Sequence, residues 1–295
     1  MDTVYNLEYR CDKIITHWFV FMISGLKDIF EGNPTDKKDS FGEGGISKEH
    51  EINWNIKNKN IKPTFPIKIH FTKGSEKRMQ YINDFQRETF EILSDEVELV
   101  ENIEDYKRPD VQIINNYGAL LQHHVNGAYP TFVDDKYFKF LRELFLSKFN
   151  FKFKNSLIYI SRNKSAGIIG SASENIKRRH ILNEDELLKS LEPLGFEKIY
   201  LEDCSVSKKI EIFNTAKIIV SPHGAGLTFS LFANKNTHIV EIVSSQREWH
   251  AQYLQITNSL GIPFHRFSDV KVDNHINNNM IVNITELVKL IKQIL

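Results

Sequence analysis

The residues best suited to bind a phosphorylated ligand lie in one short run, residues 221–227, which reads Ser-Pro-His-Gly-Ala-Gly-Leu and directly follows the apolar residues 218–220. Glycines between a strand and a helix let the backbone come close to a ligand, and the helix N-terminus offers unpaired N–H groups and a partial positive charge. The histidine adds a donor for a phosphate oxygen. Tight packing of helix on strand is the alternative use of the small residues. We predict a phosphate site at His223, Gly224, Ala225 and Gly226.

A single acidic residue, Glu241, interrupts the apolar run 238–243. Burying a carboxylate among apolar side chains costs free energy unless a partner is present. In dinucleotide-binding folds an acidic residue on the following strand binds a pair of ribose hydroxyls, and Glu241 lies at the corresponding place. A salt bridge to a neighbouring arginine or lysine is the alternative. The sequence therefore predicts that Glu241 contacts either a nucleotide ribose or a basic side chain.

Two arginines complete the predicted ligand set. Arg162 follows the apolar run 157–161, at the strand end where open α/β sheets bind ligands, and Arg179 closes a basic run over 177–179. Two guanidinium groups in one cleft can neutralise a diphosphate through paired hydrogen bonds. A solvated basic patch is the alternative for residues 177–179. We predict that Arg162 and Arg179 bind the same diphosphate.

Signatures of metal and ATP sites are absent from the sequence. It contains no Asp-x-Asp, no His-Glu-x-x-His, no Cys-x-x-Cys and no Gly-x-x-x-x-Gly-Lys-Ser/Thr. It thus indicates neither a metal cage nor an ATP-type phosphate loop. We expect a site that uses no metal ion and no other cofactor.

Short apolar runs alternate with amphipathic stretches along most of the chain. The expected strands are 67–71, 111–115, 157–161, 198–201, 218–221, 238–243 and 264–267. The expected helices are 12–31, 81–93, 136–149, 184–194, 207–216, 225–233, 248–260 and 285–294. Alternation of this kind is typical of βαβ units on parallel sheets with both faces covered.

The domain organisation follows from length and from this pattern. At 295 residues the chain is long enough for two domains, and we expect them to be residues 1–150 and 151–295. The fold class is α/β. The last helix is a candidate to pack back on the N-terminal domain. At the helix expected from residue 184, Asn183 and Glu186 are typical of a capping box.

Composition narrows the classes of partner. Hydrophobic residues make up 41% of the chain and the formal net charge is zero, which gives no electrostatic reason to expect a nucleic-acid partner. The apolar stretch 14–26 is too short to span a bilayer and lacks the features of a secretory signal. Two cysteines, Cys11 and Cys204, are too few for a disulfide framework and indicate reduced thiols. We expect a cytoplasmic protein without a membrane span.

Four motifs of the C-terminal half occur in a characteristic order. Residues 159–162 read Tyr-Ile-Ser-Arg, 179–184 read Arg-His-Ile-Leu-Asn-Glu, 216–228 read Ala-Lys-Ile-Ile-Val-Ser-Pro-His-Gly-Ala-Gly-Leu-Thr, and 240–242 read Val-Glu-Ile. Their order and spacing resemble glycosyltransferase family 61. In the N-terminal half, His17-Trp18-Phe19 and the run 129–133, Tyr-Pro-Thr-Phe-Val, resemble weaker signatures of the same family.

The resemblance implies a GT-B fold, in which two Rossmann-like domains with parallel sheets face each other across a cleft. The C-terminal domain would hold a nucleotide sugar, with UDP as the nucleotide, and the N-terminal domain would face the glycan or glycoconjugate acceptor. The resemblance also implies inversion at the anomeric carbon and no divalent ion. Arg162, Arg179, His223 and a helix N-terminus would then stabilise the leaving diphosphate. The transferred group would be a hexosyl, pentosyl or N-acetylhexosaminyl residue of a growing polysaccharide.

Two positions depart from the family pattern. After His-Gly-Ala-Gly-Leu-Thr the family has Asn where this chain has Phe229, and four residues after the histidine of His-Trp it has an acid where this chain has Phe21. The second departure leaves the general base open. His17 is suited by its pKa range, and Asp134 and Asp135 are the alternatives. A buried core histidine is the other interpretation of His17.

Two other functions remain open at this point. A nicotinamide-dependent oxidoreductase uses the same strand–glycine–helix arrangement, but a full Gly-x-Gly-x-x-Gly is missing here. A non-catalytic module that binds a nucleotide or a glycan is compatible with the departures at Phe21 and Phe229. We expect the transferase.

Overall fold

The computed structural model describes residues 2–8, 19, 23–32, 63–72, 84–100, 103–107, 110–116, 121–123, 131–133, 135–164, 179–245, 252–273 and 278–295. The chain divides into two compact units, Met1–Lys148 and Phe149–Leu295. Each unit is built on its own parallel sheet, so the expected α/β class with parallel sheets is confirmed.

The sheet of the first unit has four strands in the order β3-β2-β1-β4. These are β1 (Asp2–Glu8), β2 (Ile67–Thr72), β3 (Val97–Val100) and β4 (Val111–Asn116). The sequence predicted β2 and β4 but missed β1 and β3. β1 reads Asp-Thr-Val-Tyr-Asn-Leu-Glu and has no continuous apolar run to mark it, yet it pairs with both β2 and β4. A small antiparallel pair, β5 (Leu121–His123) and β6 (Thr131–Val133), belongs to the same unit.

Helices of the first unit supply its aromatic core. They are η2 (Ile23–Gly25), α2 (Leu26–Phe30), α3 (Asp84–Ile92), η3 (Ile103–Tyr106) and α4 (Asp135–Leu146). In α4 the buried side chains are Tyr137, Phe138, Leu141 and Phe145, which a 3.6-residue period places on one face. Phe19 lies edge-on to Phe145 with ring centroids 5.5 Å apart. α4 is therefore held by one continuous apolar stripe.

The second unit has a five-stranded parallel sheet in the order β11-β10-β9-β7-β8. The strands are β7 (Ser156–Ile160), β8 (Phe196–Ile199), β9 (Ala216–Pro222), β10 (His238–Ile242) and β11 (Phe264–Phe267). In order of appearance this is 2-1-3-4-5, so the direction of strand addition reverses between β7 and β9. In doubly wound sheets ligands bind outside the carboxyl ends of the strands at such a switch point.

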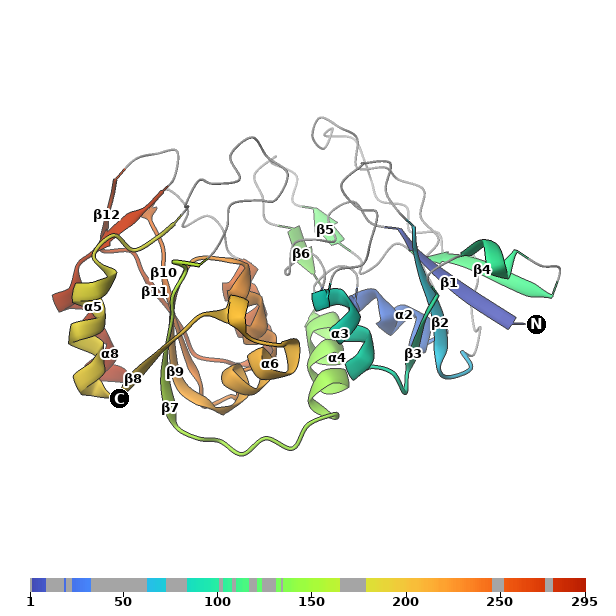
Figure 1. The fold of residues 1–295 in the computed structure, drawn as a ribbon, viewed down its shortest axis with the longest axis horizontal. Coiled ribbons are helices and arrows are strands. Elements are labelled where there is room, and N and C mark those ends of the chain that lie inside the picture. Colours follow the sequence, from blue (N-terminus) through green and yellow to red (C-terminus); the bar gives the residue numbers. More distant parts are fainter. Residues whose placement is uncertain are drawn as a thin grey trace. The chain divides into compact units, whose positions relative to one another are not determined.

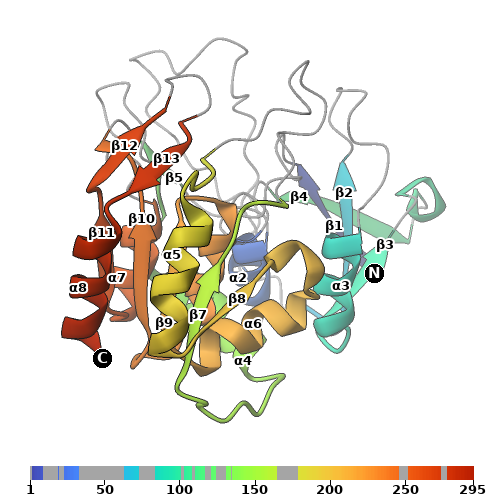
Figure 2. The same ribbon diagram turned by 60° about the vertical axis from the view of Figure 1, so that its left-hand side comes forward.

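Both faces of this sheet are covered, as Figures 1 and 2 show. One face packs on α5 (Glu184–Leu191) and α8 (Ile284–Ile294) through a cluster that includes Tyr159, Val220, Leu187 and Leu287. α8, which the sequence left as a candidate to pack on the N-terminal domain, packs on α5 within its own unit. The other elements of the unit are η4 (Glu192–Leu194), η5 (Leu201–Asp203), α6 (Val206–Thr215), η6 (Ala225–Phe232), α7 (Gln252–Leu260), β12 (Val270–Val272) and β13 (Met280–Val282).

The helix expected from residue 225 is present as the 3₁₀ helix η6. One local prediction in this unit was wrong. Asn183 does not cap α5: its side chain donates to Val282 O and accepts from Val282 N, both at 2.9 Å. The amide of Asn183 thus satisfies a strand backbone instead of a helix end, because β13 lies beside it and offers both partners.

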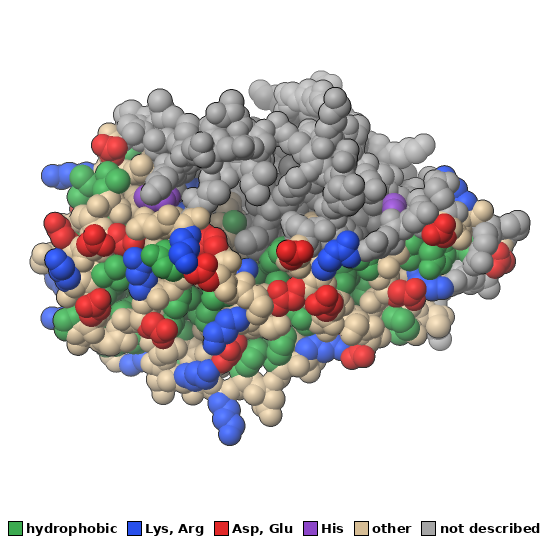
Figure 3. Space-filling view, viewed as in Figure 1, with side chains coloured by type: hydrophobic (Ala, Val, Ile, Leu, Met, Phe, Trp, Pro, Cys, Tyr) green, Lys and Arg blue, Asp and Glu red, His purple; other side chains and the backbone are tan. Residues whose placement is uncertain are grey.

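The surface agrees with the balanced composition. On the face drawn in Figure 3, acidic and basic side chains are interspersed over the described residues. In the part of the chain that the structure describes, every helix is too short or too polar to cross a bilayer.

Candidate functional site

Three of the predicted ligand residues follow the strands that flank the switch point. Arg162 comes after β7, and His223 and Gly224 come after β9, which is hydrogen-bonded to β7. His223 N donates to Ile242 O at 2.8 Å, so the backbone stays in the sheet as far as His223. The structure thereby brings together residues that lie about sixty positions apart in the sequence.

The side chain of Arg162 crosses directly over Gly224. A Cβ placed on Gly224 would lie 1.7 Å from Nη1 of Arg162 and 2.8 Å from Cζ. Gly224 has an extended backbone, so the glycine is required here by space and not by its φ angle. Because residue 224 has no side chain, the guanidinium of Arg162 can lie across the N-terminal end of η6.

The guanidinium of Arg162 lacks a full set of partners. Its Nε is buried and has no hydrogen-bond partner among the described residues. Burial lowers the pKa of Arg162, while Tyr253 and Glu202 nearby favour the charged form and raise the pKa in part. A partly buried cation with an unsatisfied N–H is costly, and an anionic ligand would supply a further acceptor for the guanidinium. Arg162 and Gly224 together form a candidate anion site.

Gly226 has a different surrounding. A Cβ there would meet Cδ1 of Leu201 at 2.6 Å, so its open side is filled by a leucine of η5. This contact corresponds to the packing alternative for the small residues. Ala225 is the first residue of η6, and Leu227, two residues further along, donates its N–H to Gly224 O.

His223 is held by a buried carboxylate. Its Nδ1 lies 2.6 Å from Oε1 of Glu241, and Nε of Arg266 donates to Oε2 of Glu241 at 2.9 Å. Glu241 is 0% exposed and His223 is 3% exposed. The ring of Tyr253 from α7 lies against His223, with centroids 5.2 Å apart. The four side chains come from the residue that follows β9 and from β10, β11 and α7.

Glu241 thus has the basic partner that the sequence left as the alternative to a ribose. Both carboxylate oxygens face protein donors. Arg266 was missed in the sequence. The only signal was a charged residue in the strand run 264–267, and the parallel register places Arg266 opposite Glu241. That pairing depends on β10 and β11 being neighbours.

Arg179 and His180 lie on a segment anchored to β13. Met280 N donates to His180 O and Leu182 N donates to Met280 O, both at 2.8 Å. The side chain of Asn279 accepts from His180 N at 3.0 Å. Arg179 has φ 59°, a left-handed conformation that is uncommon for a residue with a side chain and that often marks functional positions.

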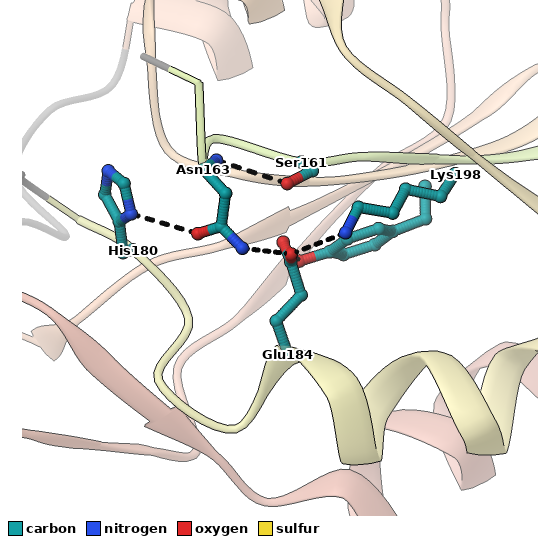
Figure 4. A network of polar contacts seen from close by, with 6 residues as sticks. Ser161, Asn163, His180, Glu184 and Lys198 are labelled. Atoms are coloured by element: carbon teal, nitrogen blue, oxygen red, sulfur yellow. Dashed lines mark hydrogen bonds and ion pairs between the residues drawn. The ribbon is translucent and has the colours of Figure 1, made fainter. Parts of the chain in front are cut away.

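A polar network fixes the ring of His180 (Figure 4). Glu184, at the start of α5, accepts hydrogen bonds from Tyr159 Oη at 2.9 Å, from Lys198 Nζ at 3.0 Å and from Asn163 Nδ2. The amide of Asn163 therefore turns its oxygen to His180 Nδ1, at 3.0 Å. Because that oxygen can only accept, Nδ1 carries the proton.

Phe229, one of the departures from the family pattern, is a core residue. It is 0% exposed and packs against Phe213 and Phe232, each with ring centroids 6.1 Å away. An aromatic side chain at this position is therefore explained by packing under η6.

The predicted catalytic bases are only partly within the described residues. His17 and Asp134 lie outside them, as does Phe21. Asp135 is the first residue of α4 and is exposed, where a negative charge is favourable at a helix N-terminus.

A buried acid that sequence reasoning missed lies in the first unit. Asp28 of α2 is 6% exposed, and Tyr137 Oη donates to it at 2.9 Å. Burial raises the pKa of Asp28 to about 6, against a lowering by the Tyr137 hydrogen bond and Lys136. No sequence signal marked Asp28, because a single acid in a helix is normally solvated.

We expect Asp28 to make the stability of the protein fall as pH rises. Its pKa is about 6 when folded and 3.8 in the reference state, so the folded protein binds the extra proton between these values. The free energy of unfolding is therefore highest below pH 4, and it falls by about 3 kcal/mol as the pH rises to about 6. Asp28→Asn keeps an acceptor for Tyr137 without the charge and should remove this loss.

Urea unfolding of both proteins at intervals from pH 4 to pH 8 measures the effect. The difference in unfolding free energy between Asp28→Asn and the wild type should grow over this range in favour of the variant. A constant difference would show that Asp28 is not the titrating group.

Metal ligands do not gather in the described residues. There, no three side chains of His, Cys, Asp or Glu lie where they could hold one ion. Arg162 lies over Gly224 at the switch point, and Arg266 of β11 donates to Glu241 behind His223.

Comparison with known proteins gives two matches. The sequence profile of the Glycosyltransferase 61 family matches residues 49–240. A xylan glycosyltransferase of Arabidopsis thaliana is 27% identical over 94 residues, which are 30% of this chain and 19% of the relative. The aligned part thus spans about a fifth of the relative's length. The family match contains Arg162, Arg179, His223 and Gly224 and ends one residue before Glu241.

Proposed function

Because the chain belongs to glycosyltransferase family 61, we propose that it transfers a sugar from a nucleotide diphosphate donor to a hydroxyl group of a glycan. The observation that carries the proposal is the incompletely satisfied guanidinium of Arg162, which lies over Gly224 beside His223. A diphosphate is the part of such a donor that a guanidinium and an imidazole recognise.

The position of these groups supports a nucleotide ligand. Arg162 and His223 follow the two strands of the switch point, where doubly wound sheets bind nucleotides. Arg179 directly precedes the segment whose backbone is held by β13, and it is the second guanidinium proposed for the diphosphate. The N-terminus of η6 adds backbone N–H groups to the same set.

We propose inversion at the anomeric carbon. The acceptor oxygen attacks that carbon from the face opposite the diphosphate, the bond between the carbon and the diphosphate oxygen breaks, and the diphosphate leaves with the bonding electrons. A base takes the acceptor proton, and His17, Asp134 and Asp135 remain the candidates. Arg162, Arg179 and His223 stabilise the charge that develops on the leaving group.

The finer assignments belong to the same proposal. We propose a GT-B arrangement in which residues 1–150 bind the acceptor and residues 151–295 bind the donor, with UDP as the nucleotide. The substrate in the relative's name makes a xylan fragment the first acceptor to test.

A panel of nucleotide sugars tests the function. Each donor is incubated with the full chain, with and without xylo-oligosaccharides, and released nucleotide diphosphate is measured. Transfer or slow donor hydrolysis supports the proposal. If a UDP-sugar raises the melting temperature but no donor is ever turned over, the protein is a binding module. If NAD raises it and no nucleotide sugar does, the donor site is misassigned.

We expect activity to survive removal of metal ions. If the positive charge at the diphosphate comes from Arg162, Arg179 and His223, 10-fold excess chelator should leave the rate within about twofold of the untreated value. Activity with EDTA, and again after addition of Mg²⁺ or Mn²⁺, measures this. Loss with EDTA and recovery with either ion would contradict our account of leaving-group stabilisation.

A further inference from the structure

His223, Glu241 and Arg266 form a cluster with more charged groups than a hydrogen bond to His223 alone requires. Glu241 is completely buried, yet it faces His223 through one oxygen and Arg266 through the other. A buried carboxylate with one partner removed is costly, so the three side chains form a unit. Arg266 is 21% exposed, so the charge of the cluster extends from the protein interior toward solvent.

The geometry determines which ring atom of His223 meets a ligand. Nδ1 is 2.6 Å from Glu241 Oε1, and a carboxylate only accepts, so Nδ1 carries a proton. Any contact with a phosphate oxygen therefore goes through Nε2. Such a contact is favourable only when Nε2 is protonated as well, because a phosphate oxygen is itself an acceptor.

The charged groups around the ring act in opposite directions. Glu241 from β10 favours the imidazolium. Arg266 from β11 and Arg162 from the segment after β7 oppose it, and Glu202 from η5 favours the charged form of Arg162. Tyr253 from α7 lies against the ring. The carboxylate is in direct contact with the ring, whereas Arg266 bonds to the far oxygen.

We propose that Glu241 is a positioning residue that holds His223 as an imidazolium, so that its Nε2–H donates to the departing diphosphate. The inference rests on the proposed transfer reaction and assigns to Glu241 a role behind His223 instead of at a ribose. Arg266 donates to the other oxygen of the same carboxylate. In this arrangement a protein cation with a fixed orientation stands at the phosphate that leaves.

NMR titration of the His223 ring tests this without any need for activity. The ring signals are assigned with His223→Gln, and their pKa is measured in the wild type, in Glu241→Gln and in Arg266→Met. We expect the wild-type ring to stay protonated above pH 7. The pKa should fall by at least about one unit in Glu241→Gln and rise in Arg266→Met, since the first removes an anion and the second a cation.

Binding of UDP supplies the second measurement. Its affinity should fall as pH rises through the pKa of His223, and this fall should begin at lower pH in Glu241→Gln and at higher pH in Arg266→Met. A loss of stability would weaken UDP binding in the same direction in both variants. Opposite shifts of the pH at which the affinity falls therefore do not arise from it. If Glu241→Gln does not fold, the wild-type titration still decides the question, because a ring that titrates below pH 7 overturns the role of Glu241.

Glu211→Gln is the matched control. Glu211 lies on α6 of the same unit and is paired with Lys154 and Lys208, so the substitution removes the same charge outside the cluster. The His223 titration should remain that of the wild type.

The two proposals fail separately. A wild-type ring that titrates below pH 7, or a pKa that is the same in wild type and Glu241→Gln, overturns the role of Glu241 and leaves the transferase standing. Absence of transfer and hydrolysis with every donor overturns the transferase, whatever the titration shows.

Discussion

Replacement of Gly224 by alanine is expected to lower UDP affinity by at least about 100-fold, because one methyl group would displace the guanidinium of Arg162. The added Cβ would lie 1.7 Å from Nη1, far inside any contact distance, so the arginine must leave its place across the entrance of η6. The backbone itself is not strained, since Gly224 is extended. The fold should therefore survive, and calorimetric titration with UDP measures the loss.

A double-mutant cycle isolates the cause. If Gly224→Ala acts only by moving Arg162, it should have almost no further effect on UDP affinity in an Arg162→Met background. Additive losses would show instead that the backbone at residue 224 contacts the ligand directly.

Gly226→Ala provides the contrast two residues away. The clash there is with the flexible end of Leu201, so we expect a lower melting temperature and a smaller loss of affinity than for Gly224→Ala. Arg162→Lys should weaken binding almost as much as Arg162→Met, because an ammonium group cannot make a planar two-point contact.

The second large effect is expected at His17. If His17 is the general base, His17→Ala should lower kcat by roughly two to four orders of magnitude and leave the affinity for UDP nearly unchanged. Its imidazole must be neutral to accept the acceptor proton, so the acidic limb of the pH–rate profile should disappear in the variant. Steady-state kinetics from pH 5 to pH 9, with UDP titrations of both proteins, test this.

The other outcomes assign His17 elsewhere. Loss of UDP binding would place it in the donor site, and a lower melting temperature with normal turnover would make it a packing histidine. Asp134→Asn and Asp135→Asn are measured in parallel, and a drop in kcat of the same size in one of them would identify the base. Asp135 is exposed at the start of α4, so its substitution should cost little stability.

Much of the local structure was determined by the sequence alone. The strands that became β7, β9, β10 and β11 were predicted to within about two residues, because a short apolar run between helical stretches is a local signal. The family motifs were also local. Their order along residues 159–242 was enough to identify the family, and the match over residues 49–240 confirms it.

Only the tertiary structure decided what each motif residue contacts. The neighbours of a strand depend on chain topology, so the sequence could not show that β7 lies beside β9 or that Arg266 stands opposite Glu241. The different surroundings of Gly224 and Gly226 could not be predicted either, because Arg162 and Leu201, which they contact, are distant in the sequence. Asn183, predicted as a helix cap, hydrogen-bonds to β13 instead, and this partner is likewise distant in the sequence. Backbone periodicity is set by neighbours in sequence, whereas the partners of a buried polar group are set by neighbours in space.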